Sequence, residues 1–86
     1  MTWKVEFTTQ ADRDFAKLTP EARRRIDKVI LGKLLVNPDL YLIPLVGDLD
    51  GLYKFRVGDY RLICAKEGRR LVITIIKIGH RREVYH

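Results

Sequence analysis

Residues 51–64 constrain the possible folds of this chain more than any other segment, because two alternating runs are joined there by Gly58 and Asp59. A Gly-Asp pair between alternating runs favours a two-residue hairpin loop. The segment therefore predicts a β-hairpin in which Arg56 pairs with Arg61. The other predicted pairs are Val57 with Tyr60, Phe55 with Leu62, and Lys54 with Ile63.

Side chains alternate between the two faces of a strand, so the predicted hairpin has one apolar face and one cationic face. The apolar face is expected to join the core and consists of Tyr53, Phe55, Val57, Tyr60, Leu62 and Cys64. The other face carries Lys54, Arg56 and Arg61, and no carboxylate balances their charge there. Like charges that face each other across a sheet destabilise it by up to about 1 kcal/mol. The cluster therefore favours an anionic ligand, although a solvated basic sheet surface would have the same composition.

The positive charge of the chain lies in its C-terminal part. The 86 residues have a formal net charge of +6. Residues 1–50 contain eight Lys or Arg and eight Asp or Glu, whereas residues 51–86 contain nine and three. A concentrated positive field attracts phosphate backbones and accelerates association with them. Nucleic acid is therefore the first expected partner, and an acidic protein is the second.

Size and composition predict one soluble domain. A chain of 86 residues can bury one modest core, so residues 1–86 are expected to form a single domain. The apolar run at residues 71–76 is too short to span a bilayer, and the charged N-terminus does not resemble a signal peptide. We therefore expect a cytoplasmic protein that makes no membrane contact. Cys64 has no second cysteine to pair with and is expected to be a buried structural thiol.

The N-terminal half predicts one strand followed by two helices. Apolar and charged side chains alternate over residues 3–7, and Thr8 or Thr9 can cap a helix that runs to about Leu18. Thr-Pro-Glu at residues 19–21 supplies a cap, a helix-starting proline and a first-turn acid for a second helix.

This second helix should run to about Val36, where Asn-Pro at residues 37–38 ends it. Residues 39–50 show no sustained period and are expected to connect the helices to the hairpin. Residues 71–78 are almost continuously apolar and β-branched, which is typical of a strand covered on both faces. We expect this strand to be internal in the sheet and to end at Gly79.

The sequence does not contain the motifs of several common active sites. Its two histidines and one cysteine do not have the spacing of metal ligands. It has no glycine-rich phosphate loop and no acidic pair for acid–base catalysis. The cationic cluster and a C-terminal tyrosine suit phosphate chemistry in which the protein positions a group and neutralises its charge, without a metal or another cofactor.

Residues 49–85 resemble a known family. Leu-Asp-Gly-Leu-Tyr-Lys-Phe-Arg-Val-Gly-Asp-Tyr-Arg-Leu-Ile, a hydrophobic strand and Gly-His-Arg-Arg-Glu-Val-Tyr follow two helices, as in the RelE branch of the RelE/ParE toxin superfamily. The resemblance extends over essentially the whole chain. It implies an α+β fold with two N-terminal helices packed on a small twisted antiparallel sheet. It also implies a bacterial type II toxin, silenced by a cognate antitoxin, that cuts mRNA in the decoding site of the ribosome with the 2′-hydroxyl as nucleophile.

Five side chains match the catalytic positions of this family. Lys54 matches the basic residue proposed to take the 2′-hydroxyl proton, and Arg56 matches a second basic residue that is often lysine. Arg61 matches a phosphate-binding arginine, Arg81 matches the residue near the leaving 5′-oxygen, and Tyr85 matches the aromatic residue that stacks on the nucleotide. For Tyr85, packing on the last strand is the alternative that the sequence by itself favours.

Two neighbouring residues are less specific. Arg82 is expected either to contact RNA or to be solvated, and His80 is expected to lie in a loop. Arginine does not deprotonate at accessible pH, so Lys54 is the only conventional base among the cations. For the same reason we expect Arg81 to stabilise the leaving oxygen by its charge.

The favoured interpretation is a metal-independent, ribosome-dependent endoribonuclease that inhibits translation. A ParE-like toxin is the first alternative, because it has the same fold but inhibits DNA gyrase without chemistry. Members of that branch generally do not have the catalytic cations and the tyrosine, so their presence here argues against it. The second alternative is a nucleic-acid-binding module without catalysis, for which a basic sheet face would suffice.

Overall fold

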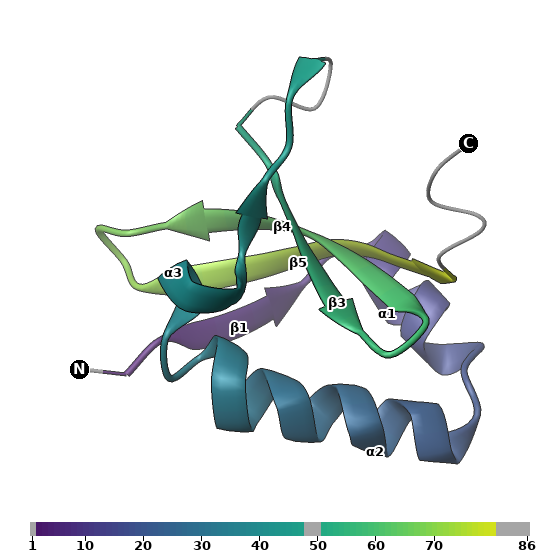
Figure 1. Cartoon of the computed structure of the whole chain (residues 1–86). Coiled ribbons are helices and arrows are strands. Elements are labelled where there is room, and N and C mark those ends of the chain that lie inside the picture. The colour runs from purple at the N-terminus through teal and green to yellow at the C-terminus, as the bar shows by residue number, and fades with distance from the viewer. Residues whose placement is uncertain (1, 48–50, 81–86) are drawn as a thin grey trace.

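The chain forms a twisted five-stranded sheet with helices on one of its faces (Figure 1). The computed structural model describes residues 2–47 and 51–80. The elements are β1 (Lys4–Phe7), α1 (Thr9–Ala16), α2 (Pro20–Val29), the π-helix η1 (Ile30–Leu34), α3 (Pro38–Tyr41), β2 (Ile43–Pro44), β3 (Tyr53–Val57), β4 (Tyr60–Glu67) and β5 (Val72–His80). Within these ranges, every helix is too short or too polar to span a bilayer.

The strand order is β1-β5-β4-β3-β2, so β5 is internal as its apolar sequence predicts. β5 runs to His80, one residue beyond the expected end at Gly79. The β2–β3, β3–β4 and β4–β5 pairs are antiparallel, whereas β1 and β5 are parallel. The sheet is therefore mixed, and the expectation of an antiparallel sheet holds for three of its four pairs. Two parallel strands need a long connection between them, and the connection from β1 to β5 contains all the other helices and strands.

The predicted hairpin is confirmed, including its register. Arg56 pairs with Arg61, and the pairs on either side follow the expected order. Gly58 has φ +59°, whereas Asp59 has no positive φ, which is the pattern of a type II′ turn. Glycine adopts this conformation without the steric cost that a side chain would bring.

Both helix starts are also as predicted. The Thr8 hydroxyl accepts a hydrogen bond from Ala11 N at 3.1 Å and caps α1. The Thr19 hydroxyl accepts one from Ala22 N at the same distance and caps α2. α2 continues directly into η1, so the second helix ends near the expected residue.

Residues 39–50, expected to be irregular, contain the end of α3 and the edge strand β2. β2 has only two residues, which pair with Lys54 and Tyr53 of β3, so it is too short to show a period in the sequence. Leu42 is buried and fills one edge of the core, whereas Leu40 is 69% exposed.

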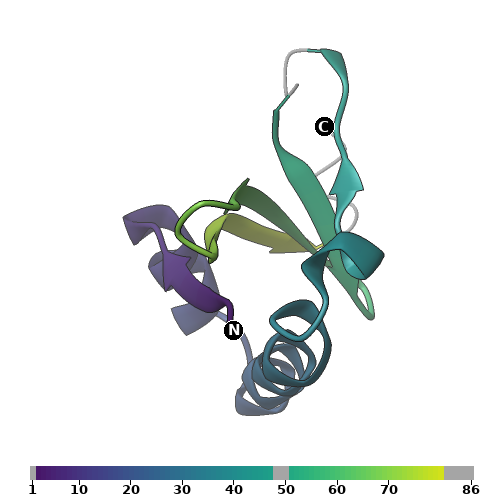
Figure 2. The same ribbon diagram turned by 90° about the vertical axis from the view of Figure 1, so that its left-hand side faces the viewer.

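The core lies between the helices and one face of the sheet. Its buried members are Ala11, Ile26, Ile30, Leu34, Leu42, Phe55, Val57, Leu62, Cys64, Ile73, Ile75 and Ile78. Edge-to-face contacts between Phe7 and Phe15 and between Tyr41 and Phe55 extend it at both sides. Figure 2 looks along α2 and shows this helix beneath the twisted sheet. In the described part of the chain, no helix covers the opposite face of the sheet.

Candidate functional site

The sheet face opposite the helices, here called the helix-free face, contains the predicted cations of the hairpin. Phe55 and Leu62 pack in the core, so their neighbours Lys54, Arg56 and Arg61 point to the other side of the sheet. Arg56 and Arg61 are directly paired, which brings two positive charges together on adjacent strands. The hairpin therefore directs the three cations to the same side of the sheet.

Arg61 is the one buried charged residue within the described ranges, at 3% exposure. Its neighbours across the sheet are Arg56 on β3 and Gly79 on β5. Burial fixes the position of the Arg61 side chain, and a fixed guanidinium fork suits bidentate binding of a phosphate group.

Lys54 is half-buried and pairs with Ile43 of β2 on one side and Ile63 of β4 on the other. Ile63 is only 3% exposed, although it lies on the helix-free face and outside the main core cluster. Among the described residues Lys54 makes no ion pair.

Arg81, Arg82 and Tyr85 lie outside the described residues, and their roles stay predictions. His80 is described and is the last residue of β5, so the expectation of a loop histidine is wrong. Its ring makes an edge-to-face contact with Tyr60, with the ring centroids 5.8 Å apart. This contact joins the ends of β4 and β5, where the cationic pair also lies.

The structure adds one cation that the sequence analysis did not single out. Lys77 pairs with Ile63 and is exposed on the helix-free face. Together with Lys54, it flanks Ile63 across three adjacent strands. The only signal in the sequence is a single charged residue within an otherwise apolar strand.

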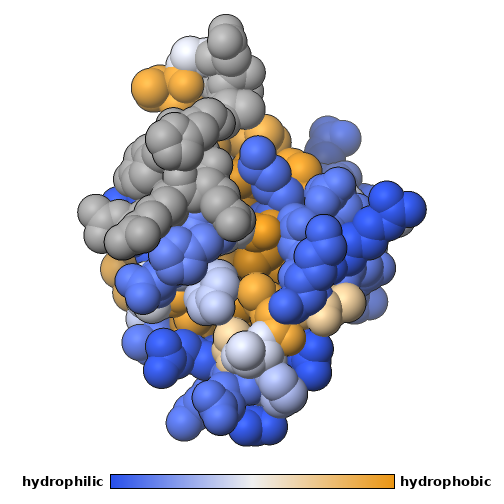
Figure 3. Space-filling view, turned by 90° about the vertical axis from the view of Figure 1, so that its right-hand side faces the viewer, coloured by the Kyte–Doolittle hydropathy of each residue, from blue (hydrophilic) through white to orange (hydrophobic). Residues whose placement is uncertain are grey.

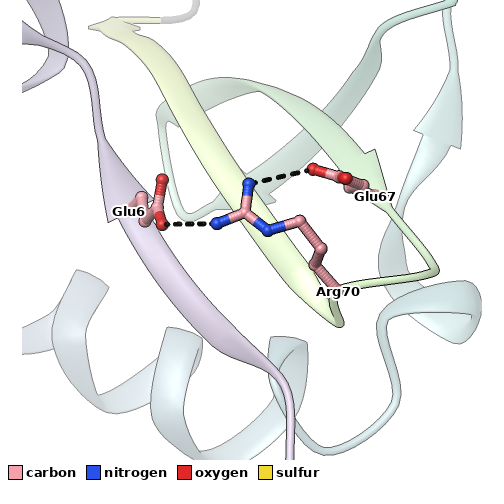
Figure 4. Close-up of polar contacts among 3 residues, drawn as sticks. All are labelled: Glu6, Glu67 and Arg70. Carbon is pink, nitrogen blue, oxygen red and sulfur yellow. Dashed lines mark hydrogen bonds and ion pairs between the residues drawn. The ribbon is translucent and has the colours of Figure 1, made fainter.

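The far end of the helix-free face has balanced charge. Arg70 Nη1 lies 3.4 Å from Glu67 Oε2, and Arg70 Nη2 lies 3.9 Å from Glu6 Oε1 (Figure 4). These three residues bring together β1, the end of β4 and the turn before β5. Positive charge on this face is therefore concentrated near the Gly58 turn and is compensated near Arg70.

Two hollows lie near the start of β4, one beside α1 and the end of β5 and the other beside the start of α2. One, of about 430 Å³, is lined by Lys17, Tyr60 and His80 among others, and the second, of about 260 Å³, includes Arg25 and Tyr60. Seen from the right-hand side of Figure 1, the surface shows apolar residues between hydrophilic ones (Figure 3). Neither hollow is lined by the hairpin cations, so both are separate from the cationic cluster.

The acidic and thiol groups do not suggest an alternative site. Within the described residues, no three His, Cys, Asp or Glu side chains are grouped so that they could hold a metal ion. Cys64 is fully buried, and burial raises the pKa of its thiol to about 12. A neutral buried thiol is a structural group rather than a nucleophile, as the sequence predicts.

Comparison with a family model defines the class of protein. The model for the ParE toxin of the type II toxin–antitoxin system parDE matches residues 5–85. This chain therefore belongs to the RelE/ParE superfamily of type II toxins.

Individual relatives identify the branch. Toxin RelG of Mycobacterium tuberculosis is 32% identical over 85 residues, which cover 99% of this chain and 98% of the relative. Toxin RelE of the same organism is 34% identical over 83 residues, covering 96% and 86%. The chain is thus a RelE-like toxin of a type II toxin–antitoxin system.

Solved structures of RelE toxins have the same fold. In the toxin–antitoxin complex RelBE2 of Mycobacterium tuberculosis, the matching chain is 31% identical with a TM-score of 0.88, covering 94% of this chain and all of that one. A mutant of E. coli RelE in the free state is 25% identical with a TM-score of 0.76, covering 99% and 92%. Helices on one face of a small mixed sheet are therefore common to this chain and its relatives.

Proposed function

We propose that this toxin is a ribosome-dependent endoribonuclease that cuts mRNA by attack of a 2′-hydroxyl on the adjacent phosphate. The observation that carries the proposal is the register of the hairpin, which puts Lys54, Arg56 and Arg61 on one helix-free face. Such a surface can hold a phosphate group and stabilise the additional negative charge of the transition state.

Each hairpin cation has a distinct proposed role. Lys54, in its neutral form, accepts the 2′-hydroxyl proton, and the freed oxygen attacks phosphorus. Arg61, which is buried, binds the non-bridging phosphate oxygens, and Arg56 adds charge beside it. The bond from phosphorus to the 5′-oxygen breaks, which gives a 2′,3′-cyclic phosphate and a 5′-hydroxyl after a proton is taken up from water.

The C-terminal residues complete the proposed site. Arg81 stabilises the negative charge that develops on the leaving 5′-oxygen, and Tyr85 stacks on the nucleotide base. Arg82 contributes a further contact to RNA. The in-line geometry of attack comes from the ribosome, which holds the mRNA while the toxin supplies charge and a base.

The test is cleavage of mRNA on programmed ribosomes by the purified protein, with the ends of the fragments mapped. We expect cleavage within the codon in the decoding site, and only poor cleavage of the same RNA without ribosomes. Equally fast cleavage of free RNA would identify a self-sufficient nuclease instead. Absence of cleavage under both conditions would refute the proposal.

A ParE-like inhibitor of DNA gyrase is the second candidate, and the ParE description of the matching family model favours it. This function would not require the cations to act on RNA. A gyrase supercoiling assay with the same protein preparation separates the two candidates. Inhibition of supercoiling without ribosome-dependent cleavage would establish the ParE-like function.

We also propose a cognate antitoxin as partner, because relatives in solved structures form RelB–RelE complexes. The charge of the helix-free face suits an acidic, partly apolar segment that folds as it binds. Hydrogen exchange of the complex should show protection at β3 and β4. A neutralised complex in which the backbone amides of both strands exchange as in the free toxin would place the inhibitory contact elsewhere.

A further inference from the structure

Simple strand alternation would direct Lys77 into the core. Ile73 and Ile75 both pack in the core, and Lys77 is two residues further along the same strand. Since side chains two apart share a face, a regular strand would bury the Lys77 ammonium group under the helices. Burial of an unpaired charge there would be strongly destabilising.

An irregularity in β5 prevents this outcome. The register of β4 and β5 shifts between Ile63 and Cys64, which pair with Lys77 and Ile75, respectively. Ile76 is therefore an extra residue without a partner on β4, as in a β-bulge. After the bulge Ile78 occupies the core position, and Lys77 is exposed on the helix-free face.

Helix α1 and its capping residue Thr8 make three hydrogen bonds to the backbone of β5 around this bulge. Thr8 N donates to Ile75 O at 3.0 Å, and the Thr8 hydroxyl donates to Ile76 O at 2.6 Å. Ile78 N donates to Asp14 Oδ2 at 2.9 Å. The bulge is thus built into the packing of α1 on the sheet, and bulges next to functional sites commonly redirect a side chain.

We infer that Lys77 is a phosphate-binding residue that extends the RNA site across β5. The inference rests on the proposed function, because it assigns Lys77 to the RNA surface of the same site. Lys54 and Lys77 both pair with Ile63, so their backbones are two strand spacings apart, about 10 Å. Two flexible lysines at this separation can hold different phosphates of one RNA strand on either side of Ile63.

Lys77 acts in binding rather than in bond cleavage. Lys77 is aligned across the sheet with Ile63 and Lys54. The paired Arg56 and Arg61 are two residues away from Lys54 and Ile63 along their strands. No ion pair within residues 2–47 and 51–80 occupies the ammonium group of Lys77. Its contribution should therefore be mainly electrostatic and depend on salt concentration.

The test compares Lys77→Ala with Lys4→Ala as a matched control. Lys4 is an exposed lysine on the same sheet face, and its partner Val72 is five residues from Lys77, about 16 Å along β5. Binding is measured over a range of salt concentrations, both to a fluorescent 2′-O-methylated single-stranded RNA and to programmed ribosomes. Single-turnover cleavage is measured on saturated ribosomes.

We expect Lys77→Ala to weaken binding to both probes by about three- to tenfold and to reduce the salt slope for the single strand by about 0.7. The cleavage rate at saturation should stay within about threefold of the wild-type rate. A residue that binds the substrate and the transition state equally well affects the affinity and not the rate at saturation. Lys77→Arg should restore the affinity, and Lys4→Ala should bind like the wild type.

Three results would overturn the inference: unchanged affinity and slope in Lys77→Ala, an equal loss in Lys4→Ala, or a loss of saturated rate without a loss of affinity. Failure of the proposed function has a different signature. If the wild-type protein does not cut ribosome-bound mRNA, but Lys77→Ala still binds RNA more weakly than the wild type, Lys77 is an RNA contact and only the proposed function fails. A wild-type protein that binds neither probe would refute both proposals.

Discussion

Lys54 is the residue with the most specific proposed role, and an experiment can separate its proposed action as a base from the effect of its charge. Lys54→Arg retains a positive charge but removes a group that can accept a proton at accessible pH. Single-turnover cleavage on saturated ribosomes should therefore fall by about 10²-fold or more. Saturation is essential, because it prevents a loss of affinity from being mistaken for a loss of chemistry.

Lys77→Arg is the control for this experiment, since the proposed function of Lys77 requires only charge. It should cleave like the wild type under the same conditions. If Lys54→Arg also cleaved like the wild type across the pH range, Lys54 would act only by its charge. The proton would then have to leave through water, the RNA or another side chain.

Cys64 gives the fold a predictable response to alkaline pH. Its pKa is raised from 9.0 to about 12, because burial disfavours the thiolate. The unfolded chain loses this proton above about pH 9, whereas the folded chain keeps it, so the free energy of unfolding should fall as pH rises from about 9 towards 12. Urea titrations should show this slope in the wild type and a smaller one in Cys64→Ala.

A faster check on Cys64 is alkylation at pH 8. The thiol is fully buried, so it should react with iodoacetamide only in denaturant. Rapid alkylation of the folded protein would contradict the burial of this side chain.

At the scale of elements, the sequence predicts those parts that depend on local signals. The hairpin register follows from alternation around Gly58 and Asp59, and the helix starts follow from Thr8 and Thr19. The three hairpin cations of the candidate site could therefore be assigned to one face before the structure was known. Their common surface is a direct consequence of a two-residue loop.

Features that depend on distant partners could not be predicted in this way. β2 is a strand only because β3 pairs with it, and β1 is parallel to β5 only because of the route of the intervening chain. The exposure of Lys77 depends on the bulge at Ile76, which is held by hydrogen bonds from α1. Periodicity along β5 alone assigns Lys77 to the wrong face.

The dual role of Thr8 gives a prediction for α1 and the bulge together. Its hydroxyl caps α1 and also donates to Ile76 O, whereas the Thr19 hydroxyl makes only the bond that caps α2 among residues 2–47 and 51–80. Thr8→Ala should reduce the free energy of unfolding by about 2 kcal/mol, half from the cap and half from the second hydrogen bond. Thr19→Ala should cost about 1 kcal/mol.

Urea unfolding of the two variants under identical conditions measures this difference. Equal losses would mean that the bond to Ile76 contributes nothing to stability. If the bulge also relaxes in Thr8→Ala, its RNA affinity should fall as in Lys77→Ala, while that of Thr19→Ala should not change.

At the scale of the whole molecule, positive charge is not confined to the sheet. Residues 1–50 are neutral in sum, but three of their eight acids lie after the π-helix, at residues 39, 48 and 50. The residues before these three acids therefore have an excess of positive charge. α2 exposes several cations, including Arg24 and Lys28, which are four residues apart and share one side of the helix. This side lies away from Ile26, which packs in the core below the sheet.

A short RNA and the ribosome should therefore contact different parts of the toxin. If the proposed function is right, a single strand short enough to cover only the helix-free face leaves the outer side of α2 without a contact, whereas ribosomal RNA is large enough to contact both. The double variant Arg24→Ala with Lys28→Ala should thus weaken ribosome binding by about tenfold and reduce its salt slope by about 1–2. Affinity for the single strand and cleavage at saturation should stay within about twofold.

Removal of this like-charged pair should change stability by less than about 0.5 kcal/mol, so unfolding would not account for the loss. Equal weakening of both probes would mean that α2 acts through the general field of the protein, and no weakening would confine ribosome contact to the other faces.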